Sequence, residues 1–190
     1  MNLTPKQFAE ELPKWYHKYC EHNAAYFLLE ERLTKKAHTL GYLEITDLVE
    51  ITRILGSRYK FIIANNVHKG NTEDEIKDKT REAIQHLNNP AAALTHMMSI
   101  SGWGRAYASK TLRCICPSNY VALDSLLIRS ISSNYLPSKN EVERYCHFLD
   151  LCRQIRRMVS VPGARENGAW FLADIEIALF QFVWDKNRIV

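Results

Sequence analysis

Hydrophobic residues recur every three or four positions along nearly the whole chain, which is the spacing of one face of an α-helix. Polar and charged residues fill the positions between them. In the first third of the chain the apolar positions are Phe8, Leu12, Trp15, Tyr19, Phe27, Leu29, Leu33, Leu43, Leu48, Ile51 and Leu55. The pattern predicts an all-α protein of about eight or nine helices. The one plausible strand is YKFII, residues 59–63.

Local signals mark the ends of several predicted helices. Thr72 with Glu75 three residues later has the pattern of a capping box. Pro90 suits the first turn of a helix that we expect to end near Met98. After a Gly-x-Gly turn the next helix is predicted over about 105–114, and Pro117 ends it. Further helices are predicted over 120–135, 138–159 and 168–186.

Composition indicates a soluble globular protein. No apolar stretch approaches the roughly 18 residues of a membrane span, and the charged, amphipathic N-terminus is unlike a signal peptide. The five cysteines are an odd number without paired spacing, which indicates free thiols in a reducing compartment. We therefore expect a cytoplasmic protein, associated with the nucleoid if it is bacterial, and no membrane partner.

The basic excess lies in the second half of the chain. Residues 1–90 contain 13 basic and 13 acidic residues, whereas residues 91–190 contain 12 basic and 8 acidic ones. Such a bias fits either an anionic partner or an ordinary solvated surface.

The same half contains ISGWGRAYASKTLR, a two-glycine turn that opens a helix. Glycines in such a turn bring backbone N–H groups close to an anion, and the helix start adds a partial positive charge. A simple corner between two helices is the alternative explanation of this turn.

The longer stretch from Met98 to Ser130 resembles the helix-hairpin-helix DNA glycosylase superfamily, which includes endonuclease III and the 8-oxoguanine and adenine glycosylases. Ile100, Gly102, Gly104, Ala108 and Asp124 match the motif of that superfamily in order. The resemblance covers about 35 residues and is closest to small stand-alone bacterial members.

The resemblance implies a two-lobed helical fold with a cleft between the lobes, in one domain spanning 1–190. We expect one lobe to contain 1–90 with the C-terminal helix 168–186. The other lobe is expected to contain 91–160, including the hairpin 97–115 and Asp124.

Two departures from the family matter. The nucleophilic lysine of members that also cut the strand would stand at position 106, which is alanine here, and the 18-residue spacing to Asp124 excludes misalignment. Lys110 lies one helical turn later, where it is a candidate nucleophile, a phosphate ligand or a partner of Asp124. The four-cysteine cluster of endonuclease III is also missing, so we expect no metal and no cofactor.

Asp124 is the expected catalytic carboxylate, because hydrolysis of an N-glycosidic bond builds positive charge on the sugar. It also suits the N-cap of the helix that follows, and the two roles are compatible.

Double-stranded DNA is the expected partner of a monomeric protein. The DNA-binding residues expected from the resemblance are Gly102, Trp103, Gly104, Arg105, Ala106, Ser109 and Arg113. Trp103 stands at the hairpin tip, where it either packs between the helices or contacts the DNA. Arg153, Arg156, Arg157 and Arg165 either contact flanking phosphates or form a solvated face.

A base must leave the duplex stack to be cut out, which requires a pocket and a wedge. The resemblance suggests Arg58, Asn65 or Asn66, and Asp174 or Glu176 for the pocket, although solvated charges explain the last two equally well. Candidate wedge or stacking aromatics are Trp15, Tyr16, Tyr26, Phe27, Tyr42 and Tyr59, which core packing also explains.

The expected function is hydrolytic release of a damaged base, in repair, or of a hypermodified base, in defence against phage DNA. We expect no strand-cutting lyase step. The alternatives are a non-catalytic helix-hairpin-helix DNA-binding module and a helical interaction protein that binds no nucleic acid.

Overall fold

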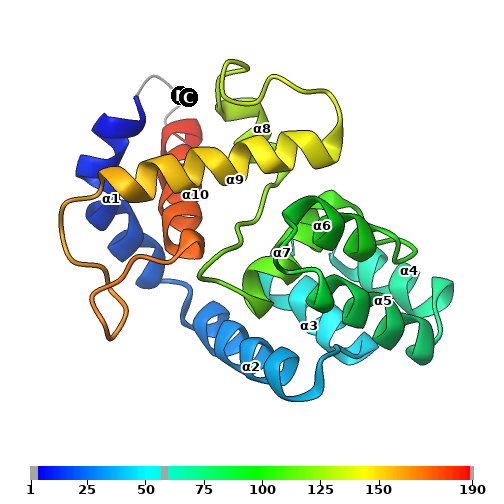
Figure 1. The fold of residues 1–190 in the computed structure, drawn as a ribbon. Coiled ribbons are helices and arrows are strands. Elements are labelled where there is room, and N and C mark those ends of the chain that lie inside the picture. Colours follow the sequence, from blue (N-terminus) through cyan, green and yellow to red (C-terminus); the bar gives the residue numbers. More distant parts are fainter. Residues whose placement is uncertain (1–3, 57–59, 189–190) are drawn as a thin grey trace. The chain divides into compact units, whose positions relative to one another are not determined.

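The computed structural model describes residues 4–56 and 60–188, and the chain is all-α throughout these residues. Ten helices lie in this part of the chain (Figure 1), and it contains no strand. They are α1 (Pro5–Cys20), α2 (Ala24–Leu40), α3 (Ile45–Leu55), α4 (Lys60–Gly70), α5 (Glu73–Gln85), α6 (Pro90–Met98), α7 (Arg105–Ile115), α8 (Ser125–Ser130), α9 (Glu141–Met158) and α10 (Leu172–Arg188). The predicted all-α class is confirmed.

Two local predictions were wrong. The segment YKFII is not a strand, because residues 60–63 form the first turn of α4. The helix expected over 120–135 is shorter, since residues 120–124 are extended and only α8 is helical. The extended residues Tyr120 to Leu123 are buried, so their apolar run reflects burial rather than a helix face.

Other local predictions are confirmed. The side chain of Thr72 accepts a hydrogen bond from the Glu75 N–H, and the Glu75 side chain accepts one from the Thr72 N–H. Pro90 is the first residue of α6, with Asn89 as its N-cap. All five cysteines are free thiols, as their count and spacing predicted.

The chain forms two compact units, which we call the terminal unit (residues 1–24 and 117–190) and the central unit (residues 25–116). This grouping differs from the expected lobes in three respects. Residues 1–24 are in a different unit from 25–90, residues 97–115 belong with the chain that precedes them, and Asp124 belongs to the same unit as α10.

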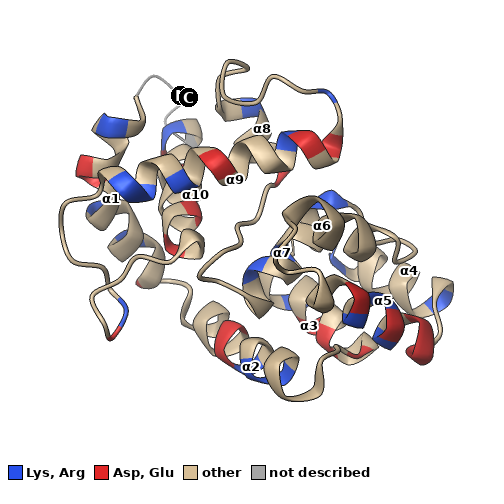
Figure 2. Cartoon of the chain, in the orientation of Figure 1, with Lys and Arg blue, Asp and Glu red and all other residues tan. Residues whose placement is uncertain are grey.

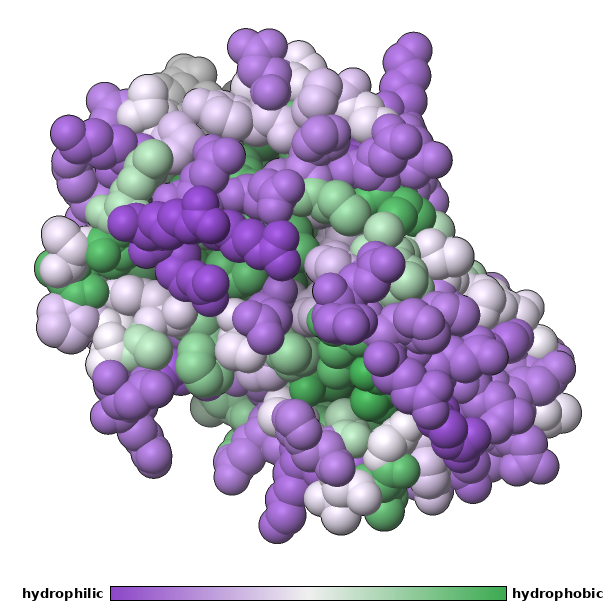
Figure 3. All heavy atoms as spheres, in the orientation of Figure 1, coloured by the Kyte–Doolittle hydropathy of each residue, from purple (hydrophilic) through white to green (hydrophobic). Residues whose placement is uncertain are grey.

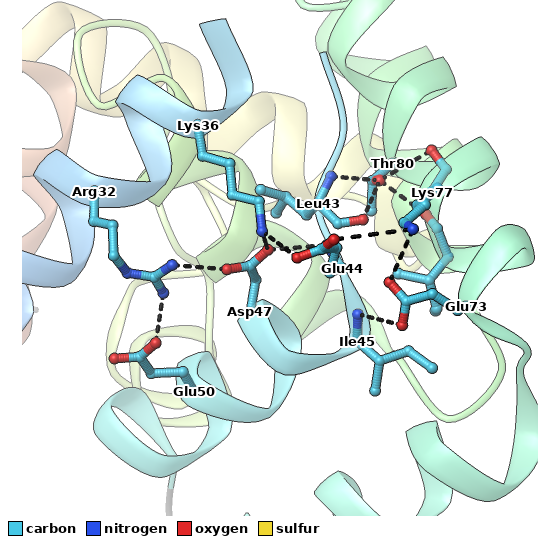
Figure 4. A network of polar contacts seen from close by, with 11 residues as sticks. Arg32, Lys36, Leu43, Glu44, Ile45, Asp47, Glu50, Glu73, Lys77 and Thr80 are labelled. Atoms are coloured by element: carbon cyan, nitrogen blue, oxygen red, sulfur yellow. Dashed lines mark hydrogen bonds and ion pairs between the residues drawn. The ribbon is translucent and has the colours of Figure 1, made fainter. Parts of the chain in front are cut away.

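In the central unit, a network of charged side chains ties three helices together (Figure 4). Asp47 of α3 is buried, and its carboxylate accepts hydrogen bonds from Arg32 at 2.8 Å and Lys36 at 2.6 Å, both on α2. Lys36 also contacts Glu44, which Lys77 of α5 approaches at 3.9 Å. Burial opposes ionisation of Asp47, but the hydrogen bonds from Lys36, the Glu44 N–H and Arg32 lower its pKa overall.

In the terminal unit, α1, α9 and α10 pack against one another, and α8 lies against α10. Phe182 of α10 makes edge-on contacts with Phe8 at 5.7 Å and Trp15 at 5.3 Å, measured between ring centroids. The extended segment before Asp124 is held in this unit by Tyr145 of α9, whose hydroxyl donates to the Val121 carbonyl.

No helix within the described residues is long and apolar enough to cross a membrane.

Candidate functional site

The connection between α6 and α7, residues 99–104, is a tight turn that we call the α6–α7 turn. The Trp103 N–H donates to the Ile100 carbonyl at 3.0 Å, and Gly102 has φ of +77°. A side chain at 102 would be strained by this φ, and its Cβ would lie 3.1 Å from the Cβ of Asn66. Glycine at 102 is therefore required by the fold of the central unit.

Gly104 is different, because the fold itself does not require glycine there. It is the N-cap of α7, with an ordinary φ of −69°, and a Cβ at this position would meet no atom within 4 Å. The space above the start of α7 is therefore open.

The first N–H groups of α7 face this open space without a side-chain cap. The Gly104 carbonyl accepts from the N–H groups of Tyr107 and Ala108, each at 3.0 Å. Within the described residues, the N–H groups of Gly104 and Ala106 form no hydrogen bond. Such a helix start has a partial positive charge and N–H donors, which suit an oxygen anion.

Asn71 holds the α6–α7 turn in place, a role that the sequence did not reveal. Its Oδ1 accepts from the Ser101 N–H at 3.0 Å, and its Nδ2 donates to the carbonyls of Ser101 and Val67, also at 3.0 Å. Asn71 is buried and directly follows α4, so its hydrogen bonds link α4 to the turn. The sequence signal was only a polar residue after Gly70, which is common in loops.

Trp103 lies in the core of the central unit and is 1% exposed. Its Nε1 donates to the Thr111 hydroxyl at 3.1 Å, and its ring lies 5.0 Å from that of Tyr107. Of the two roles considered for this side chain, packing between the helices is the one that the structure shows. The expectation of a side chain exposed to DNA at the tip was wrong, because the indole is needed to fill the interior of the turn.

Ser109 and Arg113 are also buried, so their side chains do not face solvent as DNA contacts would. Ser109 donates to the Ala106 carbonyl at 3.1 Å. The Arg113 guanidinium lies 4.5 Å from the ring centroid of Tyr26, which is hydrogen bonded to Glu30. The expected DNA contacts that remain at the surface are the exposed Gly102 and Gly104 and the partly exposed Arg105 and Ala106.

Lys110 caps another helix. Its Nζ donates to the carbonyl of Leu55, the last residue of α3, at 2.7 Å and lies 5.1 Å above the Tyr107 ring. A lysine beside the negative end of a helix interacts favourably with the last carbonyls of that helix. This hydrogen bond gives Lys110 a structural role at the end of α3.

Asp124 is the N-cap of α8 and is partly exposed. Its Oδ1 accepts from the Leu127 N–H at 3.0 Å, which confirms the capping role. Within the described residues its Oδ2 forms no hydrogen bond, so this oxygen can accept one from a ligand or from water. The buried segment before it and the cap after it together fix its orientation.

The residues expected in a base pocket are not brought together by either unit alone. Arg58 lies outside the described residues, Asn65 is exposed on α4 of the central unit, and Asp174 belongs to the terminal unit. The Asp174 carboxylate is fully buried and accepts two hydrogen bonds from Arg165, at 3.1 and 2.6 Å, and one from the Phe171 N–H. Burial raises the pKa of Asp174, although Arg165 and the Phe171 N–H oppose the increase. Its hydrogen bonds mark it as a structural carboxylate that holds the 159–171 loop.

α4 exposes an apolar pair that the sequence did not single out. The side chains of Phe61 and Ile62 are 77% and 59% exposed, and Val67 is the only buried residue of this helix. The signal was present as two adjacent apolar residues outside a regular helical spacing, and a strand prediction obscured it.

No family model, curated protein or solved structure matches this chain. Among the described residues there is no group of three His, Cys, Asp or Glu side chains that could hold a metal ion.

Proposed function

We propose that the protein is a DNA glycosylase of the helix-hairpin-helix type, which releases a base from DNA by hydrolysis. The observation that carries the proposal is the α6–α7 turn, in which an uncapped helix start lies under open space at Gly104. It is followed, 20 residues later, by a carboxylate with one engaged and one open oxygen, Asp124.

In this proposal the α6–α7 turn binds a backbone phosphate of DNA. The N–H groups of Gly104 and Ala106 donate to phosphate oxygens, and the absence of a side chain at 104 permits close approach. Because these contacts involve only backbone groups, they anchor DNA of any sequence.

Asp124 then acts at the sugar. As the base leaves, positive charge develops on the deoxyribose, and the open Oδ2 of Asp124 stabilises that charge or accepts a proton from the attacking water. The bond from the Leu127 N–H to Oδ1 keeps the carboxylate oriented. One such group contributes about 10²–10³ in rate.

Water, rather than a lysine, is the proposed nucleophile. Position 106 is alanine, and the Lys110 amine is bonded to the Leu55 carbonyl. The expected product is therefore an abasic site in an intact strand.

Release of a base from a duplex also requires that the base be unstacked. Phe61 and Ile62 are the proposed wedge, because α4 lies against the α6–α7 turn through Asn66 and Asn71. DNA bound at the turn therefore passes next to α4, and exposed apolar side chains are the groups that proteins insert between base steps.

The test is base release from two kinds of DNA, damaged duplexes and phage genomes with hypermodified cytosines. Abasic sites are scored by alkaline cleavage, with borohydride trapping in parallel. We expect alkali-labile sites from the wild type, none from Asp124→Asn, and no trapped adduct. Release from damaged duplexes would assign the protein to repair, and release from phage DNA would assign it to defence.

A non-catalytic DNA-binding module is the second candidate, since the cap to Leu127 is a sufficient structural reason for Asp124. Tight binding to duplex DNA without release of any base across the panel would favour this candidate and contradict the glycosylase proposal.

A further inference from the structure

The C-terminal half of α9 carries an unusual concentration of positive charge. From Leu151 to Arg165 the chain contains four arginines and no acidic residue. Figure 2 shows acidic positions toward the start of α9 and basic positions toward its end. On α5, in contrast, basic residues alternate with acidic partners, as in the pair of Arg81 with Asp78.

Three of these arginines lie close together on the helix surface. Arg153, Arg156 and Arg157 are separated by three and four positions, which places neighbouring side chains on adjacent turns. In Figure 3 strongly hydrophilic side chains gather over the same part of α9. We call these three residues the α9 arginine cluster.

A single carboxylate accompanies the cluster. Asp150 pairs with Arg153 at 2.9 Å, whereas neither Arg156 nor Arg157 forms an ion pair within the described part of the chain. The pKa of Arg156 is lowered by burial and by the charges of Arg153 and Arg157. The negative end of α9 attracts the two arginines of the last turn, but Arg153 precedes that turn. Arg156 and Arg157 therefore carry positive charge without a carboxylate partner among the described residues.

Arg156 connects the cluster to the segment that leads to Asp124. Its Nη1 donates to the Ser118 carbonyl at 3.0 Å, and the Ala173 N–H of α10 donates to the neighbouring Pro117 carbonyl at 3.0 Å. From Ser118 the chain runs through the buried residues 120–123 to Asp124. The cluster and the carboxylate thus belong to one unit and are held by the same segment.

Guanidinium groups suit phosphate well. A guanidinium has five N–H donors in a planar fork that matches two phosphate oxygens. The bond to Ser118 leaves most donors of Arg156 for a ligand and limits its motion before binding. A phosphodiester would also relieve the repulsion among the three charges.

We propose that the α9 arginine cluster is a second phosphate-binding site, which holds a backbone phosphodiester of DNA on the same unit as Asp124. The inference rests on the proposed function, because it takes DNA as the ligand. It adds to the terminal unit a DNA contact that is independent of the α6–α7 turn.

The test is the salt dependence of binding to an undamaged 20-base-pair duplex, measured by fluorescence anisotropy. Each phosphate contact contributes about 0.9 to the slope of log affinity against log salt concentration. We expect Arg153→Gln with Arg157→Gln to reduce the slope by about 0.9, the contribution of one phosphate, and Arg157→Gln alone to reduce it by a part of that amount. The matched control is Arg81→Gln, because Arg81, like Arg153, is a surface arginine paired with an aspartate three residues earlier. It should leave the slope unchanged.

A scan with neutral methylphosphonates locates the contact. A methylphosphonate at the position that contacts the cluster should weaken binding of the wild type but not of the double variant. Methylphosphonates at the other contacted positions should weaken binding of both proteins. Wild-type binding with unchanged slopes in both variants would overturn the cluster assignment and leave the glycosylase proposal standing. Failure of the wild type to bind duplex DNA at low salt would overturn both proposals. Thermal melting of each variant, followed by circular dichroism, tests whether unfolding causes a reduced salt dependence of binding.

Discussion

Gly102 and Gly104, two positions apart in the α6–α7 turn, have different roles. Gly102 is required by its positive φ and by the nearby Asn66, whereas Gly104 has ordinary backbone geometry and open space above it. The proposed phosphate site would explain a glycine that the fold does not need, since a side chain at 104 would stand over the first N–H groups of α7.

This difference predicts opposite effects of Gly104→Ser on stability and on binding. Serine is a better N-cap than glycine, so the free energy of unfolding should stay the same or rise by a few tenths of a kcal/mol. DNA affinity should fall about tenfold, because the serine hydroxyl competes with phosphate for the same N–H groups. Thermal melting and anisotropy measure the two quantities.

Gly102→Ala is the contrasting variant. It should lower the free energy of unfolding by about 1–2 kcal/mol, because alanine is strained at φ of +77° and its Cβ meets Asn66.

If Gly104→Ser bound DNA as well as the wild type, the α6–α7 turn would not be the phosphate site.

At the scale of elements, α4 combines two properties that rarely occur together. It is fixed to its neighbours by Asn71, yet it presents Phe61 and Ile62 to solvent. Adjacent exposed apolar side chains suit a contact with another molecule, and the proposed phosphate site at the neighbouring turn makes DNA the proposed one.

The wedge role predicts a loss of base unstacking in Phe61→Ala. In a duplex with 2-aminopurine at the target position, the fluorescence increase on binding should fall for this variant, and base release should slow about tenfold or more. Release from a single-stranded oligonucleotide should change little, since no base pair has to be opened.

Leu28→Ala is the matched control, because Leu28 of α2 is an apolar residue of the central unit that is also largely exposed. Equal fluorescence increases for wild type, Phe61→Ala and Leu28→Ala would show that α4 is not the wedge.

Because of the charged network between α2, α3 and α5, we expect the stability of the central unit to decrease at acidic pH (Figure 4). The pKa of Asp47 is lowered in the folded state, so its contribution to stability is complete above the unfolded pKa of about 3.9 and is lost as pH falls further. Asp47→Asn should cost about 1–3 kcal/mol at neutral pH, and its stability should decrease less than that of the wild type below pH 4.

Urea unfolding at several pH values measures this difference. Asp78→Asn is the control, since its exposed pair with Arg81 should contribute little at any pH. Parallel pH profiles for wild type and Asp47→Asn would contradict the role given to this carboxylate.

Across the whole molecule, the sequence predicted the features that depend on neighbouring residues, namely the helix ends and the all-α class. The cap at Thr72, the start of α6 at Pro90 and the cap at Asp124 depend on residues within three positions of one another, and all three are present. The all-α class follows from the same short-range periodicity.

Long-range packing determined the features that the sequence did not predict. Residues 120–123 are apolar because they are buried as an extended chain, with the Val121 carbonyl bonded to Tyr145. Trp103 at the tip of the turn and Arg113 on a basic helix suggest surface positions, but both are buried. Trp103 is hydrogen bonded to Thr111, and Arg113 lies over the ring of Tyr26. The expected lobes placed α1 with α10, but the grouping of α9 with them joins chain segments more than a hundred residues apart, which no local pattern encodes.

The proposed function assigns one binding group to the central unit, the α6–α7 turn, and one reacting group to the terminal unit, Asp124. The most direct measurement is the single-turnover rate of base release by the wild type, Asp124→Asn and Asp124→Ala, with melting temperatures taken in parallel. Asparagine keeps the cap and alanine removes it, so only Asp124→Ala should lose about 1 kcal/mol of stability. Both variants should lose base release, by about 10² or more, although Asp124→Asn should remain as stable as the wild type. Base release by Asp124→Asn at the wild-type rate would contradict the catalytic role of Asp124.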